Sequence, residues 1–184
     1  ECLAGKFALK GSSSCQICPR GRYGGDYLGD KKSSDCAGSC LPGRYGLGGS
    51  LTDQCDGPCP RGSFSIGGAS TKLCTLCTSG TFSNTTGSTS CLSCVKGTFA
   101  QNDGSVKCSQ CPAGRFSNVS GSKSCEHECD PGTYGLGGSI SKECDGKCSP
   151  GSYSAGGATT ETCSLCHAGK YTNTYGASAC EHIC

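Results

Sequence analysis

The sequence lacks the side chains that usually build a large hydrophobic core. It contains no Met and no Trp, and aromatic residues account for 7% of its 184 positions. Hydrophobic residues reach only 34%, even with the 21 cysteines counted among them. A shared core of ordinary globular size is therefore not expected, and stability must come from another source.

The sequence also lacks a large excess of either charge. The 16 Lys and Arg residues nearly balance the 14 Asp and Glu residues, and no basic block is longer than Lys31-Lys32. Nucleic acid and anionic membranes are therefore poor partners, because both select concentrated positive charge.

The sequence has no initiator Met, no signal peptide and no apolar run long enough to span a membrane, so we expect an excerpt of a processed, secreted product.

The sequence also lacks a set of residues arranged as in a catalytic site. The repeated Ser, Thr and Gly have no His or carboxylate at a fixed spacing that would activate a nucleophile. His127, His167 and His182 each lie close to a cysteine, and we interpret them as solvated surface residues. The sequence therefore predicts no enzyme, no cofactor and no metal.

A six-residue motif recurs along the chain: a cysteine is followed three positions later by Gly and five positions later by Phe or Tyr. Every Phe and five of the seven Tyr belong to this motif, so we interpret the ring as the packing residue of each repeat. Repetition at a fixed spacing indicates an array of equivalent units. The motif begins at Cys2, Cys18, Cys40, Cys59, Cys77, Cys94, Cys111, Cys129, Cys148 and Cys166.

The cysteine content predicts where the protein is found. With 21 cysteines in 184 residues, the chain has the composition of a disulfide scaffold. Disulfides in this number persist only in an oxidising compartment, so the chain is predicted to be extracellular or on the cell surface. Two N-glycosylation sequons agree with this location, because Asn84-Thr85-Thr86 and Asn118-Val119-Ser120 each begin two residues after a motif ring.

The loops between close cysteine pairs come in two main sizes. Thirteen-residue loops carry one Gly four positions before the next cysteine, and fourteen-residue loops carry a double Gly. Because Gly tolerates positive φ and disfavours helix, each loop is predicted to be a short, two-stranded β ribbon whose turn is made by these glycines. The predicted fold class is a small disulfide-rich, elongated tandem array with little or no helix and no common core. The lone glycines are Gly87, Gly104, Gly121 and Gly176, and the double glycines begin at Gly48, Gly67, Gly137 and Gly156.

A longer period divides the chain into blocks. Residues 36–91 realign with residues 125–180 at an offset of 89 positions, and Cys94 corresponds to Cys184 one position further along. We therefore predict irregular repeats over residues 1–35, a five-loop block over residues 36–124, and a second, partial block over residues 125–184 that is truncated after Cys184. The insertion after Cys18, at residues 24–32, is predicted to form an irregular protrusion.

Two disulfide schemes remain open. In the first, the second cysteine of one close pair joins the first cysteine of the next, which leaves Cys184 unpaired or inter-chain. In the second, neighbouring pairs interlace, as in Cys15 with Cys36 and Cys18 with Cys40. Interlacing would make alternate loops inequivalent, whereas the Gly and the ring recur in every loop, so we favour the first scheme. It joins Cys2 to Cys15, Cys18 to Cys36, Cys40 to Cys55, Cys59 to Cys74, Cys77 to Cys91, Cys94 to Cys108, Cys111 to Cys125, Cys129 to Cys144, Cys148 to Cys163 and Cys166 to Cys180.

One local spacing is typical of a four-cysteine zinc site, namely Cys74-x2-Cys77-x13-Cys91-x2-Cys94. The three-residue spacings elsewhere, the unbroken series of similar loops and the odd number of cysteines argue against zinc. We therefore interpret these cysteines as members of disulfides.

The segment Cys111-Pro-Ala-Gly114-Arg-Phe116-Ser-Asn-Val-Ser-Gly121-Ser-Lys-Ser-Cys125 resembles a repeat of the ephrin-receptor-like, growth-factor-receptor-type cysteine-rich family. It is also similar to the first loop of tumour necrosis factor receptor modules, in which the flanking cysteines pair with each other. The tandem, Gly-rich form resembles surface or flagellar-hair proteins of algae and other protists. Modules of this type serve as receptor stalks, adhesins and fibre subunits, so the resemblance implies an extracellular module and leaves its role open.

We expect a structural protein that self-associates into a surface filament; the alternative is a stalk or ligand-binding ectodomain of a receptor or adhesin. The spacing Cys180-Glu-His-Ile-Cys184 is of the three-residue kind that elsewhere opens a double-Gly loop. The polypeptide is therefore expected to continue, or Cys184 is expected to find its partner on another molecule, which would make a covalent head-to-tail polymer.

The sequons predict N-linked glycans on Asn84 and Asn118. Peptide mass spectrometry of native material, before and after enzymatic removal of N-glycans, should show the sugar mass at both asparagines and its replacement by Asp. Asn102, which begins no sequon, serves as the internal control. Unmodified Asn at both sequons would contradict the prediction.

Overall fold

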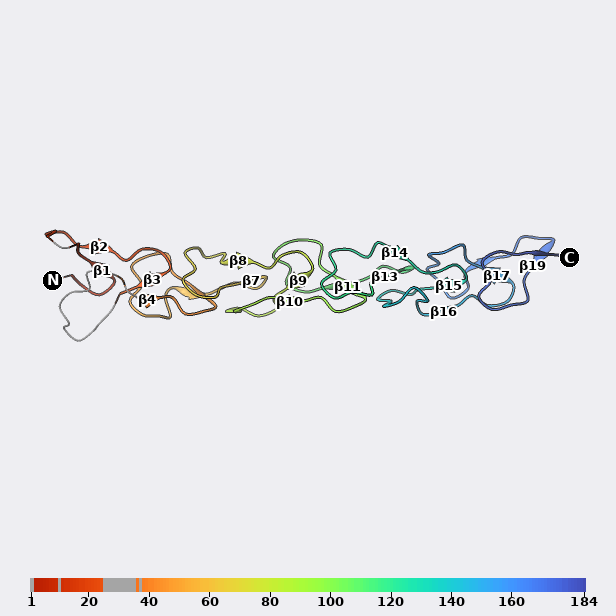
Figure 1. The fold of residues 1–184 in the computed structure, drawn as a ribbon, viewed down its shortest axis with the longest axis horizontal. Helices are drawn as coiled ribbons and strands as arrows, with labels where there is room; N and C mark the ends of the chain where they lie inside the picture. The colour runs from red at the N-terminus through yellow and green to blue at the C-terminus, as the bar shows by residue number, and fades with distance from the viewer. Residues whose placement is uncertain (1, 10, 25–35, 37) are drawn as a thin grey trace. The chain divides into compact units, whose positions relative to one another are not determined.

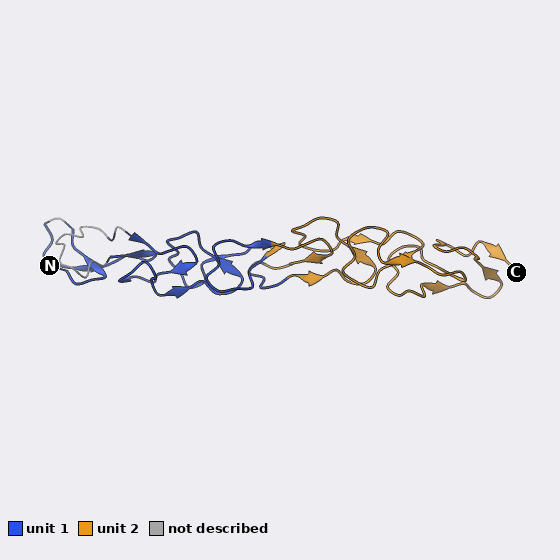
Figure 2. Cartoon of the chain, turned by 90° about the horizontal axis from the view of Figure 1, so that it is seen from below, with its two compact units in different colours: residues 1–78, 82–92, 103–107 blue, residues 79–81, 93–102, 108–184 orange. Residues whose placement is uncertain are grey.

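The computed structural model describes residues 2–9, 11–24, 36 and 38–184. Contacts divide the chain into two compact units (Figure 2): residues 1–78, 82–92 and 103–107 form the first, and residues 79–81, 93–102 and 108–184 form the second. Each unit is a succession of disulfide-closed loops, and the described residues form strands and turns without any helix. Among these described residues there is therefore no helix that could cross a membrane.

Every loop contributes one strand to a two-stranded antiparallel sheet (Figure 1). In a representative pair, Thr98 lies opposite Gln110 and Phe99 lies opposite Ser109. The ring-bearing strand lies inside the loop, whereas its partner is the link that follows the closing cysteine. The predicted ribbon is therefore present, but its second strand lies outside the loop. The pairs are β1 (Lys6–Phe7) with β2 (Gln16–Ile17), β3 (Arg22–Tyr23) with β4 (Gly38–Ser39), β5 (Arg44–Tyr45) with β6 (Gly57–Pro58), β7 (Ser63–Phe64) with β8 (Thr75–Leu76), β9 (Thr81–Phe82) with β10 (Leu92–Ser93), β11 (Thr98–Phe99) with β12 (Ser109–Gln110), β13 (Arg115–Phe116) with β14 (His127–Glu128), β15 (Thr133–Tyr134) with β16 (Gly146–Lys147), β17 (Ser152–Tyr153) with β18 (Ser164–Leu165), and β19 (Lys170–Tyr171) with β20 (His182–Ile183).

Consecutive loops are joined by a repeating set of backbone hydrogen bonds. The motif Gly97 donates to the carbonyl oxygen of Ser117 at 2.8 Å, and Ala100 donates to that of Ser122 at 3.1 Å. In the return direction, the turn Gly121 donates to the carbonyl oxygen of Cys94 at 2.7 Å. Equivalent bonds recur along both units, so the backbone groups of such short strands are satisfied by the next loop.

Except in the last two loops, each motif Gly also lies against the turn Gly two loops further along. A Cβ built on Gly80 would overlap the carbonyl oxygen of Gly121, and one built on Gly97 would overlap that of Gly138. These motif glycines have φ values of 85° and 76°, a region that favours Gly. The lack of room for a Cβ atom and the positive φ therefore both favour Gly at these positions. Because every interior loop contacts its second neighbour as well as its first, the contacts reach further than nearest-neighbour stacking predicts. The same overlap occurs for Gly5 with Gly49, Gly21 with Gly68, Gly43 with Gly87, Gly62 with Gly104, Gly114 with Gly157 and Gly132 with Gly176.

The fourteen-residue loops accommodate their extra residue at two places. The second Gly of each double Gly takes the position of the lone Gly, with φ of 72° at Gly49 against 72° at Gly87. The closing cysteine then adopts positive φ, as Cys55 does at 47°. This conformation costs a non-Gly residue about 1–2 kcal/mol, and sequence reasoning did not predict it. The other cysteines in this conformation are Cys74, Cys144 and Cys163.

The buried residues recur at the same positions of successive loops and do not gather into one common core. Opening cysteines such as Cys94 are fully buried, and small residues that follow the ring, such as Ser83 and Ala100, are buried beside them. The predicted division of the chain at residues 36 and 125 rests on sequence repetition and stays a prediction. The predicted protrusion after Cys18 falls largely on residues 25–32, outside the described part of the chain.

Substituting a motif Gly should separate the effect of φ from the effect of contact. Gly80 and Gly151 share φ values of 85° and 84°, but no atom lies within 4 Å of a Cβ built on Gly151. Gly151→Ala should cost about 1–2 kcal/mol because of φ alone. Gly80→Ala should cost about 1–3 kcal/mol more, because its Cβ meets backbone. Hydrogen exchange of the amides in the neighbouring loops measures both losses, and equal losses would contradict the contact between second neighbours.

Candidate functional site

The cysteines form ten disulfides, each closing one loop between neighbouring cysteine pairs. Their Cα–Cα distances are 5.5–5.8 Å, within the range usual for disulfides. This is the nearest-neighbour arrangement, and the described cysteines form no interlaced bridge. Cys184 carries an exposed free thiol, although its N–H donates to the Gly169 carbonyl oxygen at 3.1 Å, as the opening cysteines of other loops do to the motif Gly of the preceding loop.

In six of the eight interior bridges, the opening cysteine is buried and the closing cysteine is only half-buried, whereas both cysteines are buried in Cys18–Cys36 and Cys111–Cys125. The opening cysteines Cys18, Cys59 and Cys77 are completely buried, whereas the closing cysteines Cys74 and Cys91 are half-buried. The reason is that the turn Gly of the next loop bonds to the carbonyl of the opening cysteine and covers it. Loop stacking therefore protects the opening cysteine of each interior bridge from solvent.

The four cysteines that have the spacing of a zinc site are all in disulfides. Cys77 joins Cys91, while Cys74 and Cys94 are bonded to the neighbouring cysteines Cys59 and Cys108. Among the residues that the structure describes, no group of three His, Cys, Asp or Glu side chains is arranged to hold a metal ion.

The three histidines have exposed side chains, as interpreted from the sequence. Two of them lie against motif rings across a hairpin: the ring centroids of Phe116 and His127 are 5.4 Å apart, and those of Tyr171 and His182 are 5.1 Å apart. These histidines extend the packing of the ring at the surface of their loops.

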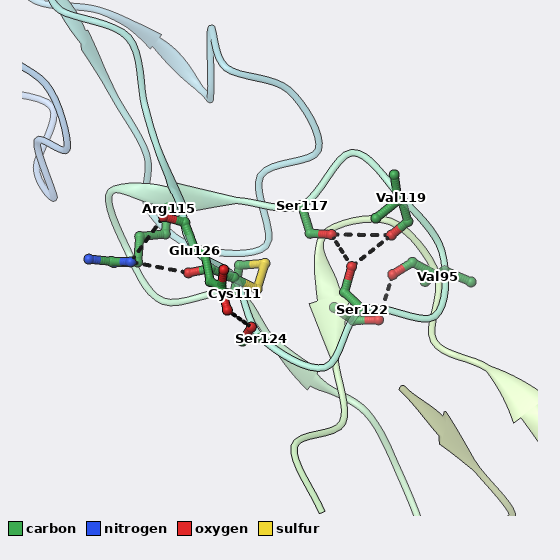
Figure 3. The surroundings of a disulfide bond; sticks show 10 residues. Val95, Cys111, Arg115, Ser117, Val119, Ser122, Ser124 and Glu126 are labelled. Atoms are coloured by element: carbon green, nitrogen blue, oxygen red, sulfur yellow. Dashed lines mark hydrogen bonds between the residues drawn. A yellow bond between two sulfur atoms is a disulfide. The ribbon is translucent and has the colours of Figure 1, made fainter. Parts of the chain in front are cut away.

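Polar side chains surround the bridge between Cys111 and Cys125 (Figure 3). The hydroxyl oxygens of Ser117 and Ser122 are 2.5 Å apart, and each hydroxyl lies 3.1 Å from the carbonyl oxygen of Val119. The Arg115 guanidinium donates to the carbonyl oxygen of Cys125 at 3.3 Å. The partners of the two hydroxyls are each other and a carbonyl, so this network holds the turn and supplies no general base.

An exposed ion pair marks the eighth loop. The Lys142 ammonium lies 3.0 Å from a carboxylate oxygen of Asp130, and this hydrogen bond raises the pKa of Lys142. A backbone hydrogen bond lowers the pKa of the neighbouring Glu143. All three side chains are solvated, so they contribute little to stability.

Both sequons lie in the same kind of turn. Asn84 and Asn118 are exposed and directly follow the buried Ser83 and Ser117. The hydroxyl of Ser83 donates to the Thr85 carbonyl oxygen at 3.1 Å, as that of Ser117 does to the carbonyl of Val119. Sequence reasoning found the asparagines but missed the supporting serines, whose signal is a Ser before each sequon Asn and another five positions later.

The motif rings differ in burial along the chain. Phe116 is 8% exposed, Tyr171 is 42% exposed, and the other eight rings are half-buried. Interpreting the rings as packing residues therefore fits Phe116 best and Tyr171 least.

Comparison with known proteins identifies the type of repeat. Residues 65–105 and residues 80–129 match the family model described as "Tyrosine-protein kinase ephrin type A/B receptor-like". The two matches overlap and together cover residues 65–129, which include the complete loops closed at Cys91, Cys108 and Cys125. A comparison with curated proteins finds no significant match.

The contrast between two rings gives a stability prediction. Phe116→Ala should destabilise its loop by about 3 kcal/mol, because a buried ring is removed. Tyr171→Ala should cost roughly 1 kcal/mol or less, because much of that ring already faces water. Hydrogen exchange localised to each loop measures the two losses. If Phe116→Ala left exchange unchanged, the ring would be free to serve as a ligand-binding residue instead.

Proposed function

We propose that this chain, whose residues 65–129 match the ephrin-receptor-like cysteine-rich family, is a non-enzymatic structural segment of an extracellular filament. One observation carries the proposal: the loops repeat the same bridge, the same hairpin and the same contacts to their neighbours. Equivalent repeats suit a mechanical function, whereas an enzyme needs one place that differs from the rest.

An extracellular location is supported by the covalent structure. Twenty of the 21 cysteines are in disulfides, a state that the cytosol does not sustain. The exposed side chains of Asn84 and Asn118 suit the attachment of N-linked glycans. Because the tandem, Gly-rich repeats resemble those of flagellar-hair proteins, we place the chain in that class of surface fibre.

Self-association is the partner interaction that the proposal requires. The exposed thiol of Cys184 is held at the position of an opening cysteine, because its N–H already bonds to Gly169. A loop that supplies the missing sulfur would extend the array without new geometry. That loop belongs either to the same polypeptide or to a second molecule.

A second candidate function is the stalk or ligand-binding ectodomain of a surface receptor or adhesin. The specific observation in its favour is the family match, whose description names ephrin receptors. A stalk would present isolated chains with solvated surfaces, whereas a filament subunit would bury lateral or end-to-end contacts between chains.

Non-reducing electrophoresis and electron microscopy of native material test the proposal. We expect filaments in the micrographs, together with either a ladder of covalent multimers that collapses on reduction or one long polypeptide. Expressed chains carrying Cys184→Ser should lose any ladder, and Ser178→Ala, a change at an exposed position outside the bridges, should not. A short monomer with a free thiol at Cys184, and no filaments, would make the ectodomain the better assignment.

A further inference from the structure

We propose that tension on the chain is carried through the disulfides and the short links, which excludes the loops from the load and fixes a limit to extension. Each bridge joins cysteines that are 13 to 18 positions apart in the sequence but only 5.5–5.8 Å apart in space. A force applied at the ends therefore passes from the opening cysteine to the closing cysteine through sulfur. This inference deepens the proposed structural function and rests on it only for its biological use.

Covalent geometry sets the limit. A fully extended backbone spans at most about 3.3–3.6 Å per residue, so the reduced chain of 184 residues could reach about 600–660 Å. With all ten bridges closed, only the links extend and each loop adds 5.5–5.8 Å, which gives about 180 Å in total. The bridged chain is thus limited to under a third of its reduced length.

The hairpins determine which hydrogen bonds break before this limit is reached. In each hairpin, the link strand lies in the path of the load and the ring strand lies inside the loop, as β12 and β11 do. Tension therefore peels the link from the ring strand and breaks the bond from the Cys111 N–H to the Gly97 carbonyl oxygen, 2.9 Å long. The bonds between loops, such as that from Gly97 to Ser117, act in parallel with the link, because they join the two loops that the link connects. Extension before the limit thus breaks hydrogen bonds and no covalent bond, and these hydrogen bonds can form again when the load is removed.

Longer extension requires a bridge to open. A dithiol reductant converts one cystine to two thiols and is itself oxidised to a disulfide, so the loop behind that bridge joins the load path. Opening Cys94–Cys108, with a separation of 14, should add about 40–45 Å. Opening Cys18–Cys36, with a separation of 18, should add about 55–60 Å.

Single-molecule force spectroscopy of the full chain, held at its two ends, tests the inference. Without reductant, we expect extension to stop near about 180 Å, with no steps of about 40–60 Å. The double substitution Cys94→Ser with Cys108→Ser should lengthen the chain by about 40–45 Å, and the matched control Cys184→Ser should leave the length unchanged. Contour length depends on covalent connectivity, so a folding defect in the variant does not obscure the result.

Adding a dithiol to the wild-type chain under load should release the remaining length in discrete steps towards about 600 Å. Extension far beyond about 180 Å without reductant, or a double variant no longer than wild type, would overturn the inference. These measurements use isolated chains and do not depend on filament formation. A failure of the proposed filament would appear in the micrographs and gels and leave the force curves unchanged.

Discussion

Close packing of a motif Gly against the turn Gly two loops later is the constraint on which the structure depends. It brings three successive loops to one place, where a side chain would meet backbone oxygen. Each motif Gly donates a hydrogen bond to the next loop, and each turn Gly donates one to the opening cysteine of the loop before it. Both bonds require the backbones of these loops to lie equally close together. Because the contact is between backbones, it leaves the outward positions of each loop free to vary.

The disulfides make this arrangement stable in the absence of a hydrophobic core. Most of the fully buried side chains are cysteines, and one or two half-buried rings do not offset the entropy of ordering a loop. Closing a loop of about 15 residues removes roughly 3 kcal/mol of that entropy from the unfolded chain. Stacking in turn covers the opening sulfur, so the covalent and non-covalent parts of each repeat depend on each other.

Equivalence of the loops is also the main argument about function. The hydroxyl groups near the bridge Cys111–Cys125 bond to one another and to backbone, and the zinc-like cysteines are committed to disulfides. The larger differences from loop to loop lie at the surface, such as a sequon at Asn84 or a leucine at Leu136. Such a pattern suits a protein whose shared framework bears load and whose surface positions set its contacts.

The sequence by itself determined the covalent plan. The recurrence of Gly and a ring in every loop favoured the nearest-neighbour bridges, and the glycine content predicted turns at positive φ and no helix, as the described residues show. Only the tertiary structure decided that the second strand of each hairpin is the link, that Gly80 meets Gly121, and that Cys55 adopts positive φ. The reason is that a sequence period reports that loops are alike, whereas the rotation from one loop to the next, which depends on packing, decides which of them touch.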